Sequence, residues 1–467
     1  MKSIQFFKGL SWLIALNLLV KPIWIFFIDR QIQNVVGYEE YGKYFAVLNL
    51  SYVLFFLSDA GLSNMLNQKL ANNITINVKQ LLQIKFILLL CYFILFCFIG
   101  WLTHISNLSL LLYVILIQIM TSLVIFLRNI ITANQLFTTD AWLSVIDKFL
   151  MTVFCGSLLY TSLFGSISLI RFLQIQTACT GFAVVMCALV IIRKKIITPG
   201  VNENVDAIVK QIFPFAIIIL LMSVHYRFDG FLLERTNSAF QAGIYASAYR
   251  LLDASNMIGY LCASFLLPFV ARHLNDKKLI EEATLNTRHF LLFCAITISS
   301  FAIVFAPWIE TVLYHSNSKY NSLVIQLCMA AFPGYCLVHV YGAVLTASSK
   351  FKQLISILIL SVILNIVLNF ILIPSYGAVG CCFAALVSQY FCGITAYIVG
   401  TNKLKIAYGL QSVFFYILSA VLLTGLFYFG KTAVINVWII LAVAVCFSLM
   451  VLVTQLSFFK KYFLSYR

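Results

Sequence analysis

Charged residues are scarce in this sequence. Only 10% of its 467 residues are Asp, Glu, Lys or Arg, whereas about 25% are charged in an ordinary soluble domain. Acidic residues are the rarest, with 15 Asp and Glu against 31 Lys and Arg, and 62% of the chain is hydrophobic. This balance excludes an ordinary soluble globular protein.

Motifs of enzymes and metal centres are also missing. The sequence has no CxxC pair, no His residues at zinc-binding spacing, no nucleotide-binding loop and no nucleophile–base pair. Its 13 cysteines lie almost wholly within apolar runs, as Cys91 and Cys187 do. Cysteine in that setting behaves as a small hydrophobic residue. We therefore predict no metal, no cofactor and no enzymatic activity.

Long apolar runs recur along the whole chain, each near the twenty residues that cross a bilayer core as a helix. Strand-length segments of alternating hydrophobicity, which mark a membrane barrel, are absent. The sequence therefore predicts an all-α polytopic membrane protein with about fourteen transmembrane helices and no large soluble domain. We expect the helices at roughly residues 9–28, 43–65, 83–103, 108–128, 142–163, 168–192, 208–232, 241–268, 289–313, 322–347, 353–373, 376–400, 411–430 and 434–456.

Basic residues indicate how these helices are oriented. About 21 Lys and Arg, including Lys85 and Arg288, fall in one set of connections, and about 5 fall in the alternate set. Because basic connections stay in the cytoplasm, both termini are predicted to be cytoplasmic. This asymmetry accounts for most of the net charge of +16, so the charge does not call for nucleic acid. Although Lys2 and Lys8 precede the first apolar run, it is long and lacks a cleavage site, so we interpret it as an uncleaved helix.

Two pairs of similar segments indicate an internal repeat. Residues 27–44 resemble residues 227–245, and residues 132–137 resemble residues 346–351. Both pairs are offset by about 200–214 residues, or six predicted helices, and each pair occupies equivalent helix positions. In the first pair, the matched positions are Asp29, Gly42 and Tyr44 against Asp229, Gly243 and Tyr245.

Six is an even number, so the two halves enter the membrane from the same side. This is a parallel repeat about an axis along the membrane normal, as in two-lobed transporters. We predict one six-helix lobe at residues 1–195 and a second at 205–400. The basic, Pro-Gly and polar stretch RKKIITPGVNENVDA, residues 193–207, is the expected linker. Residues 408–467 would then add two helices and a cytoplasmic tail.

Ionisable groups inside the predicted helices are the candidate site residues. A charge at a helix centre costs about 2.5–3.5 kcal/mol on insertion scales, so it usually faces a cavity or a partner. Five of these groups are cations and three are acids, and an excess of cations suits an anionic ligand such as a phosphate. They are Lys21, Lys148, Arg171, Arg227, Arg250, Asp147, Asp229 and Asp253.

Some of these residues have a simpler interpretation. Arg171 lies near the outer end of its predicted helix, where its side chain can snorkel to the interface. Asp147 and Lys148 can form a local or interhelical ion pair in place of a binding site. Lys21 lies roughly 10 Å from the outer boundary at helical rise, which is farther than its side chain reaches. It is therefore the better cavity candidate.

Three other polar residues have alternatives of the same kind. His339 is alone in its predicted helix and is either a hydrogen-bonded helix contact or a proton relay. Arg128 and Asp59 lie at predicted cytoplasmic helix ends, where topology or capping accounts for them.

The stretch MSVHYRFDGFL, residues 222–232, places three ionisable groups at the end of an apolar run. His225 and Asp229 are four residues apart and share a helix face, whereas Arg227 points elsewhere. We expect Asp229 to pair with a cation of the adjacent helix, such as Arg250, and Asp29 to be a structural partner in its own lobe. Arg227 then either faces the central cavity or snorkels to the outer interface.

Four segments resemble a known family. YRFDGFLLERTNSAFQAGIYASAYRLLD (226–253) is similar to the oligosaccharide flippase pattern of aromatic-aromatic-Arg-x-Asp followed by Gly-x-Tyr-x-x-Ala-x-Arg. GYEEYGKYFAVLNL (37–50) and FLSDAGLSNMLNQKLA (56–71) resemble the pattern of its first lobe. LNIVLNFILIPSYGAVGCCFAALVSQY (364–390) resembles its Ile-Pro-x-x-Gly-x-x-Gly signature, with Cys381-Cys382 where members often have two alanines. The family is that of the O-antigen and capsule-repeat flippases, within the multidrug/oligosaccharidyl-lipid/polysaccharide exporter superfamily.

This resemblance implies a flippase that moves an undecaprenyl-diphosphate-linked oligosaccharide across the bacterial cytoplasmic (inner) membrane by alternating access of two lobes. It implies a role in the biosynthesis of surface polysaccharide, such as O-antigen, capsule or exopolysaccharide. Membrane lipid, a polysaccharide polymerase and a chain-length regulator are the implied partners of a monomeric protein. Whether protons or sodium ions drive the cycle stays open.

Two other functions are compatible with so apolar a chain. A cation-coupled exporter of drugs or metabolites from the same superfamily would have a cavity in the first lobe with mainly carboxylate side chains. The only acid of that lobe that we expect to be buried is Asp147, beside Lys148. A membrane sugar-repeat polymerase would carry a large extracytoplasmic loop, and this sequence has none.

Overall fold

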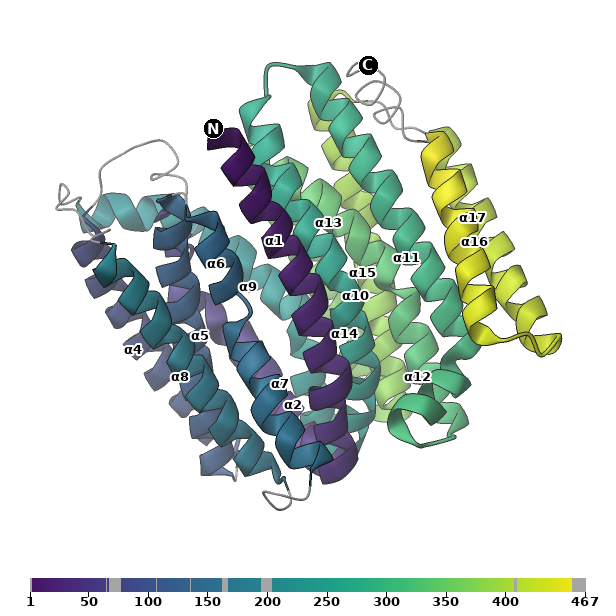
Figure 1. Cartoon of the computed structure of the whole chain (residues 1–467), viewed down its shortest axis with the longest axis horizontal. Coiled ribbons are helices and arrows are strands. Elements are labelled where there is room, and N and C mark those ends of the chain that lie inside the picture. The colour runs from purple at the N-terminus through teal and green to yellow at the C-terminus, as the bar shows by residue number, and fades with distance from the viewer. Residues whose placement is uncertain are drawn as a thin grey trace. The chain divides into compact units, whose positions relative to one another are not determined.

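A computed structural model describes residues 2–63, 65–66, 77–105, 107–134, 136–161, 167–194, 204–406 and 410–455 (Figure 1). These residues form helices joined by short connections, and no strand occurs among them. The predicted all-α class is therefore confirmed.

The chain divides into two compact units, residues 1–243 and 244–467. The predicted linker at 193–207 lies largely outside the described residues. Within the first unit, α9 packs along α2, which places α9 with the helices that precede it. The helices that begin in this unit are α1 (Lys2–Ile23), the π-helix η1 (Trp24–Asp29), α2 (Arg30–Asp59), α4 (Val78–Leu102), α5 (Leu108–Ala133), α6 (Phe137–Leu143), α7 (Ile146–Tyr160), α8 (Leu169–Arg193), α9 (Val205–Thr236) and α10 (Ala239–Arg272).

The second unit contains most of α10 and all the helices that follow it. Its central helices are α11 and α13, and α14 and α15 pack against each other beside α13. The two C-terminal helices, α16 and α17, pack against each other and against α11. The remaining bounds are α11 (Lys277–Tyr314), α12 (Lys319–Ala330), α13 (Phe332–Ala347), α14 (Phe351–Tyr376), α15 (Ala378–Leu404), α16 (Leu410–Thr432) and α17 (Val437–Gln455).

Among the described residues, twelve helical segments are long and apolar enough to cross a membrane, and Val437–Val453 is a shorter apolar helix. The first segment, Trp12–Asp59, has 48 residues. It would be about 72 Å long if straight, more than twice the roughly 30 Å of a bilayer core. Gly37 breaks it with φ 83° and ψ 166°, a conformation open essentially only to glycine. The segment contains most of two predicted spans, 9–28 and 43–65, so each of the fourteen predicted spans corresponds mainly to helix among the described residues.

Short polar side chains fix where many of these helices begin. The amide oxygen of Asn77 accepts hydrogen bonds from the backbone of Lys79 and Gln80 at 3.0 and 3.4 Å, and so caps α4. Such caps satisfy backbone N–H groups that have no partner in the first helical turn. The same role is filled at α5, α8, α9, α11 and α12 by Asn107, Ser168, Asn204, Asp276 and Ser318.

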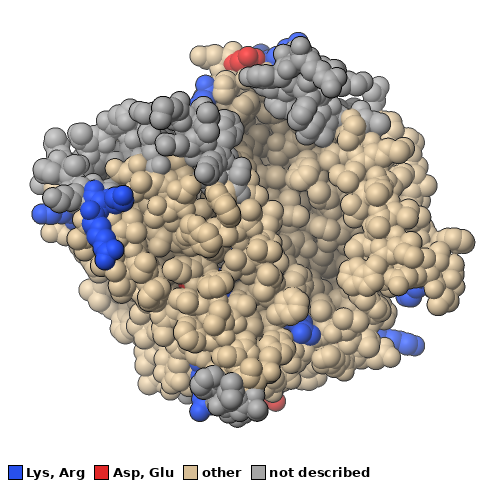
Figure 2. All heavy atoms as spheres, in the orientation of Figure 1, with Lys and Arg blue, Asp and Glu red and all other residues tan. Residues whose placement is uncertain are grey.

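The helices expose large apolar side chains over much of their length. On α4 these include Phe86, Ile87, Leu90 and Ile94, each at least 58% exposed. Figure 2 shows a face on which Lys, Arg, Asp and Glu are sparse. So much exposed apolar surface is a liability in water but is the normal surface of a protein in lipid. The described part of the chain is thus a multi-pass membrane protein.

Two glycines allow an unusually close crossing at the connection between α9 and α10. A Cβ atom on Gly42 would lie 1.8 Å from the carbonyl oxygen of Ala239, and one on Gly243 would lie 2.0 Å from that of Tyr38. Gln33 donates a hydrogen bond from Nε2 to the carbonyl of Gly243 at 2.8 Å. The contact is reciprocal: Gly42 meets Ala239, four residues before Gly243, and Gly243 meets Tyr38, four residues before Gly42. These are the same two glycines that the sequence repeat pairs.

Candidate functional site

A helix break positions the candidate site in the first unit. The predicted span 142–163 is two helices, α6 and α7, separated by a turn at Ser144 and Val145. Asn17 of α1 donates a hydrogen bond from Nδ2 to the hydroxyl of Ser144 at 2.8 Å, which fastens α1 to the break. The break places the N-terminus of α7 inside the apolar segment, and the positive end of a helix dipole there favours an anion.

Two lysines flank this break at similar depth. Lys21 lies one turn beyond Asn17 on α1, and Lys148 lies one turn beyond Ser144 on α7. Helices α1, α6 and α7 pack together and run in the same direction (Figure 1). The Lys148 ammonium lies 3.4 Å from an Asp147 oxygen, with both side chains about one-fifth exposed. Lys21 interacts electrostatically with Asp147 and Lys148. The structure therefore brings three predicted site residues together.

Trp24 completes this cluster. It is the first residue of η1, which directly follows Ile23, the last residue of α1. The Lys148 ammonium lies 4.4 Å from the centre of the Trp24 ring, within the range of a cation–π interaction. We name Lys21, Trp24, Asp147 and Lys148 the lysine cluster.

Arg128 lies at the edge of the lysine cluster and acts electrostatically on Lys21. It holds Asp140 of α6 in a two-point contact, Nε to Oδ1 at 2.7 Å and Nη2 to Oδ2 at 3.0 Å. Such paired hydrogen bonds are the strongest arrangement between Arg and a carboxylate. The two carboxylates of this region, Asp140 and Asp147, therefore have different partners. Asp140 is occupied by Arg128, and the two lysines share Asp147.

Arg227 and its neighbours lie on α9. The guanidinium carbon of Arg227 lies 4.8 Å from the ring centre of Tyr52 on α2, and the residue is partly buried. Asp229 and His225 are almost fully buried, each 1% exposed. Asp29 is fully buried, and the Tyr41 hydroxyl donates to its Oδ2 at 2.9 Å, so the expectation that Asp147 is the only buried acid of the first lobe is wrong.

The other predicted site residues lie elsewhere. Arg171 is exposed in the first turn of α8, a position that suits interfacial snorkelling. In the second unit, Arg250 Nη1 lies 3.8 Å from Asp253 Oδ2, one turn along α10. The expected pairing of Arg250 with Asp229 stays a prediction. His339 is buried on α13, with its ring centre 4.5 Å from that of Tyr260 in an edge-to-face arrangement.

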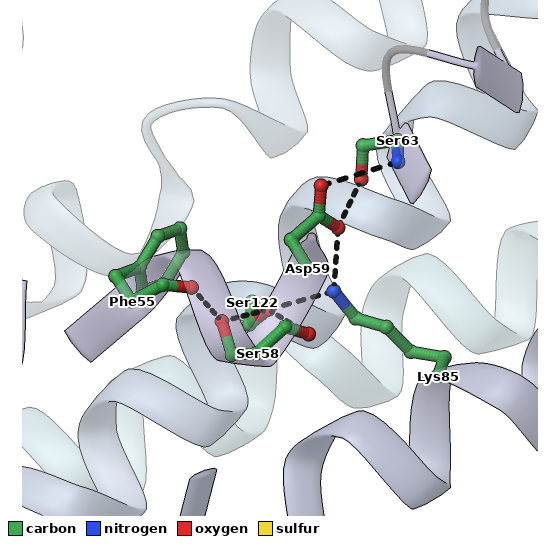
Figure 3. Close-up of polar contacts among 6 residues, drawn as sticks. All are labelled: Phe55, Ser58, Asp59, Ser63, Lys85 and Ser122. Carbon is green, nitrogen blue, oxygen red and sulfur yellow. Dashed lines mark hydrogen bonds and ion pairs between the residues drawn. The ribbon is translucent and has the colours of Figure 1, made fainter. Parts of the chain in front are cut away.

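A buried ion pair joins α2, α4 and α5, and sequence reasoning missed it. The Lys85 ammonium lies 2.7 Å from Asp59 Oδ1 and donates to the Ser122 hydroxyl at 2.7 Å (Figure 3). The Lys85 side chain is 0% exposed and that of Asp59 is 11% exposed. Asp59 also accepts from the hydroxyl of Ser63 at 2.6 Å and from its backbone at 3.2 Å (Figure 3). The sequence pattern places Lys85 in a cytoplasmic connection and shows its partner, Asp59, only as a helix end.

Arg288 is likewise expected in a connection, yet it is 1% exposed inside the second unit. Its guanidinium donates to the hydroxyls of Tyr341 and Tyr416 at 3.1 and 3.2 Å. It borders a cavity of about 600 Å³ between α11, α13, α15 and α16. Most of the lining is apolar, including Leu292 and Ile394. The arrangement is a largely hydrophobic pocket that contains one cation.

Among the described residues, no three His, Cys, Asp or Glu side chains are grouped so that they could hold a metal ion. What the lysine cluster can do chemically is hold an anion. Two ammonium groups share one carboxylate at the positive end of a helix, so an anionic oxygen there would be attracted by uncompensated charge.

Solved structures of other membrane proteins share this fold. No family model and no curated protein sequence matches this chain. Among solved structures, the lipid II flippase MurJ in an inward closed conformation is 13% identical and superposes with a TM-score of 0.68 over 99% of both chains. The chain therefore has the same fold as this flippase.

Two transporters of the multidrug/oligosaccharidyl-lipid/polysaccharide exporter (MOP) superfamily share this fold. An inward-facing multidrug resistance transporter of the MATE family is 13% identical, with a TM-score of 0.56 over 84% of this chain and 94% of its own. A MOP superfamily transporter from Pyrococcus furiosus Vc1 is 12% identical, with a TM-score of 0.59 over 86% of this chain and 95% of its own. At such identities the likeness to these three structures establishes the fold alone, and the cargo depends on the chemistry of the site.

Proposed function

We propose that this protein is a flippase that moves an undecaprenyl-diphosphate-linked oligosaccharide repeat unit to the outer leaflet of the bacterial cytoplasmic membrane. Both termini would face the cytoplasm, and the product would feed surface polysaccharide assembly by a polymerase and a chain-length regulator. The resemblance of residues 226–253 and 364–390 to oligosaccharide flippases supports this cargo. The MOP fold is compatible with it.

The observation that carries the proposal is the charge balance of the lysine cluster. Lys21 and Lys148 share Asp147, because Arg128 occupies Asp140. A membrane-embedded cation is expensive unless it is compensated. A diphosphate would supply the missing negative charge, and the two lysines would each attract one of its phosphates as point charges.

The second unit by itself contains a cavity suited to an apolar chain. Its walls are mainly aliphatic and aromatic, and Arg288 is the only charged residue among those that line it. An apolar chain is stabilised in such a site by about 25 cal/mol per Å² of surface removed from water, although lipid competes for the same chain.

The extent of the likeness to MurJ also favours a lipid-linked cargo. That flippase covers 99% of this chain, whereas the MATE and Pyrococcus furiosus transporters cover 84% and 86%. The flippase thus matches almost the whole length of this chain, and the two transporters match less of it.

The second candidate function is a cation-coupled exporter of drugs or metabolites, which the MATE fold favours. The Pyrococcus furiosus transporter has a binding pocket of reverse polarity, which suggests a different function for that protein. By the same reasoning, a cluster dominated by lysines argues against a cationic drug. A cluster in which carboxylates outnumber lysines would instead have favoured the exporter.

Reconstitution separates the two functions. Purified protein is placed in liposomes with a fluorescent undecaprenyl-diphosphate-linked oligosaccharide in the inner leaflet, and its arrival outside is followed with a membrane-impermeant quencher. We expect lipid transfer by the native protein, and a roughly ten- to hundredfold lower rate for Lys21→Gln and Lys148→Gln, because each loses a charge-assisted contact.

Lys43→Gln is the matched control, because Lys43 is an exposed lysine paired with Glu39 and Glu40 outside the cluster. Its rate should equal that of the native protein. Transport of a cationic dye driven by a proton or sodium gradient, with no lipid transfer, would instead establish the exporter.

A further inference from the structure

The indole N–H of Trp24 is an unused donor in the middle of the lysine cluster. Trp24 is 9% exposed, and its Nε1 is buried with no hydrogen-bond partner among the described residues. A buried tryptophan N–H usually finds an acceptor, because an unsatisfied buried donor destabilises the folded state. An orphaned donor of this kind therefore requires an explanation.

The surrounding structure holds the Trp24 ring in place. It begins a π-helix, an element found frequently at functional sites. Tyr160, at the end of α7, donates a hydrogen bond to the carbonyl of Phe27 at 2.8 Å and so fastens η1 to α7. Ile25 and Ile28 of η1 are buried, at 3% and 0% exposed. Since Lys148 lies over the ring face, α7 constrains both the ring and the ammonium above it.

The chemistry of the cluster identifies what the N–H would bind. An indole N–H only donates, so its partner is an acceptor atom and not a cation. Lys148 lies over the ring, and Lys21 lies one helical turn earlier on the chain. An acceptor oxygen bound to Nε1 would therefore be close to two positive charges, which favour an anionic oxygen over a neutral one.

A purely structural role for Trp24 does not explain why its buried N–H has no hydrogen-bond partner. Packing and the cation–π contact need the ring but not its N–H, and a phenylalanine would supply both. Trp12 and Trp142 offer a comparison, since their rings pack 6.1 Å apart and are 45% and 59% exposed. Because both residues are exposed, neither has to satisfy a buried N–H, whereas Trp24 does.

We propose that Trp24 is a cargo-positioning residue whose Nε1–H donates a hydrogen bond to a phosphate oxygen of the lipid diphosphate. Lys148, fixed over the ring, and Lys21 supply the opposing charge. This proposal rests on the proposed function, and it adds a neutral directional donor to a site otherwise made of point charges. A point charge attracts phosphate from many directions, whereas the N–H fixes one oxygen in the plane of the ring.

The test uses Trp24→Phe in the full-length protein, which keeps an aromatic ring beneath Lys148 and removes the N–H donor together with the second ring of the indole. The probe is undecaprenyl diphosphate without sugar, titrated into protein in lipid nanodiscs. A hydrogen bond to a charged group corresponds to roughly a ten- to hundredfold change in affinity, so we expect Trp24→Phe to weaken binding by that factor. Undecaprenol, which lacks the diphosphate, should bind both proteins equally.

Trp12→Phe is the matched control and should bind the probe as the native protein does. Trp24→Leu should bind more weakly than Trp24→Phe, because Lys148 also loses its ring. A spectroscopic measurement tests the contact directly. In protein labelled with ¹⁵N at tryptophan, the indole signal that disappears in Trp24→Phe should move when undecaprenyl diphosphate is added, and should stay in place with undecaprenol.

The outcomes separate this proposal from the one on which it rests. If the native protein does not bind undecaprenyl diphosphate, the proposed function is wrong. If the native protein binds it and Trp24→Phe binds equally well with an unmoved indole signal, the flippase proposal stands and Trp24 is only a packing residue. Weaker binding by Trp24→Phe, with unchanged thermal unfolding, supports the positioning role.

Discussion

At the scale of single residues, burial distinguishes two kinds of lysine in this protein. Lys43 is 44% exposed and lies 3.3 and 3.1 Å from Glu39 and Glu40. Lys85 is fully buried and bound to Asp59 and Ser122. Exposed ion pairs contribute about 0–1 kcal/mol, because water screens them. Removing one partner of a buried pair costs about 3–5 kcal/mol, because the other charge is left without compensation.

The first prediction concerns this buried pair. Lys85→Met should lower the free energy of unfolding by about 3–5 kcal/mol, since Asp59 would stay buried without its cation. The double variant Asp59→Asn/Lys85→Met should recover much of that loss, because asparagine carries no charge and still accepts from Ser63. Thermal unfolding of the purified proteins measures both, with Lys43→Met as the control. Equal losses in the single and double variants would show that the charges are not coupled.

The second prediction concerns Arg227, which lies over Tyr52. If Arg227 binds the cargo diphosphate, Arg227→Ala should abolish transport while membrane levels stay near normal. Arg227→Lys should retain part of the activity, since an ammonium attracts phosphate but lacks the paired donors of Arg. Surface glycan and protein level are measured together. Normal glycan in the alanine variant would remove Arg227 from the site, and low protein level would indicate a structural role.

At the scale of elements, the crossing of α2 and α10 depends on the absence of two side chains. A Cβ on Gly42 would lie 1.8 Å from a backbone oxygen of Ala239, and backbone cannot move aside as a side chain can. By contrast, a Cβ on Gly342 of α13 would meet nothing within 4 Å. The same substitution should therefore have opposite effects at the two sites.

The third prediction follows from this contrast. Gly42→Ala should destabilise the described packing by about 1–3 kcal/mol, the usual range for overpacking, or drive the two helices apart. Gly342→Ala should be neutral or stabilise by up to about 1 kcal/mol, because alanine favours the helix. Thermal unfolding compares the two variants. Indistinguishable effects would mean that the α2–α10 contact is not maintained in the membrane.

At the scale of the whole molecule, alternating access requires the predicted lobes 1–195 and 205–400 to move relative to each other. Tyr38 and Phe240 belong to different predicted lobes, and their ring centres are 5.7 Å apart. Trp12 and Trp142 belong to the same predicted lobe, with ring centres 6.1 Å apart. The ring spacings of the two pairs are similar. A covalent link in the first pair would join the two predicted lobes, whereas a link in the second pair would lie within one lobe.

The fourth prediction uses both pairs in a variant from which the native cysteines have been removed. Cross-linking Tyr38→Cys to Phe240→Cys should stop lipid transfer, with the protein still inserted, because the outer ends of the lobes could no longer separate. Cross-linking Trp12→Cys to Trp142→Cys should leave transfer unchanged. Reduction of the first link should restore activity. Full activity of the first linked protein would rule out this form of alternating access.

Helix number and class could be predicted because they depend on local composition. An apolar run of about twenty residues forms a helix in lipid whatever surrounds it, since its backbone has no other partner there. Helix ends were less predictable. The expected connection at 29–42 is mostly helical, because Asp29, Gln33 and Tyr41 find buried hydrogen bonds within the unit.

Parts of the candidate site were equally visible in the sequence. Lys21, Asp147 and Lys148 could be selected because an ionisable group in an apolar run is rare. Trp24 could not, since an aromatic residue in such a run is ordinary, and only its orphaned N–H and the ammonium over its ring single it out. The turn at Ser144 and Val145 contains no proline or glycine to announce it, and Asn17 from another helix binds it.

The sequence by itself thus determined that this protein crosses the membrane many times as helices, and it identified some of the ionisable residues that lie within them. Tertiary structure alone decided which charges meet. Lys85 and Arg288 resemble the ends of cytoplasmic connections in the sequence but are buried groups, because α4 and α11 extend past the expected boundaries and pack against other helices. Hydropathy is a sum over neighbours in the chain, whereas an ion pair or an anion site joins residues from different helices, and only packing brings them together.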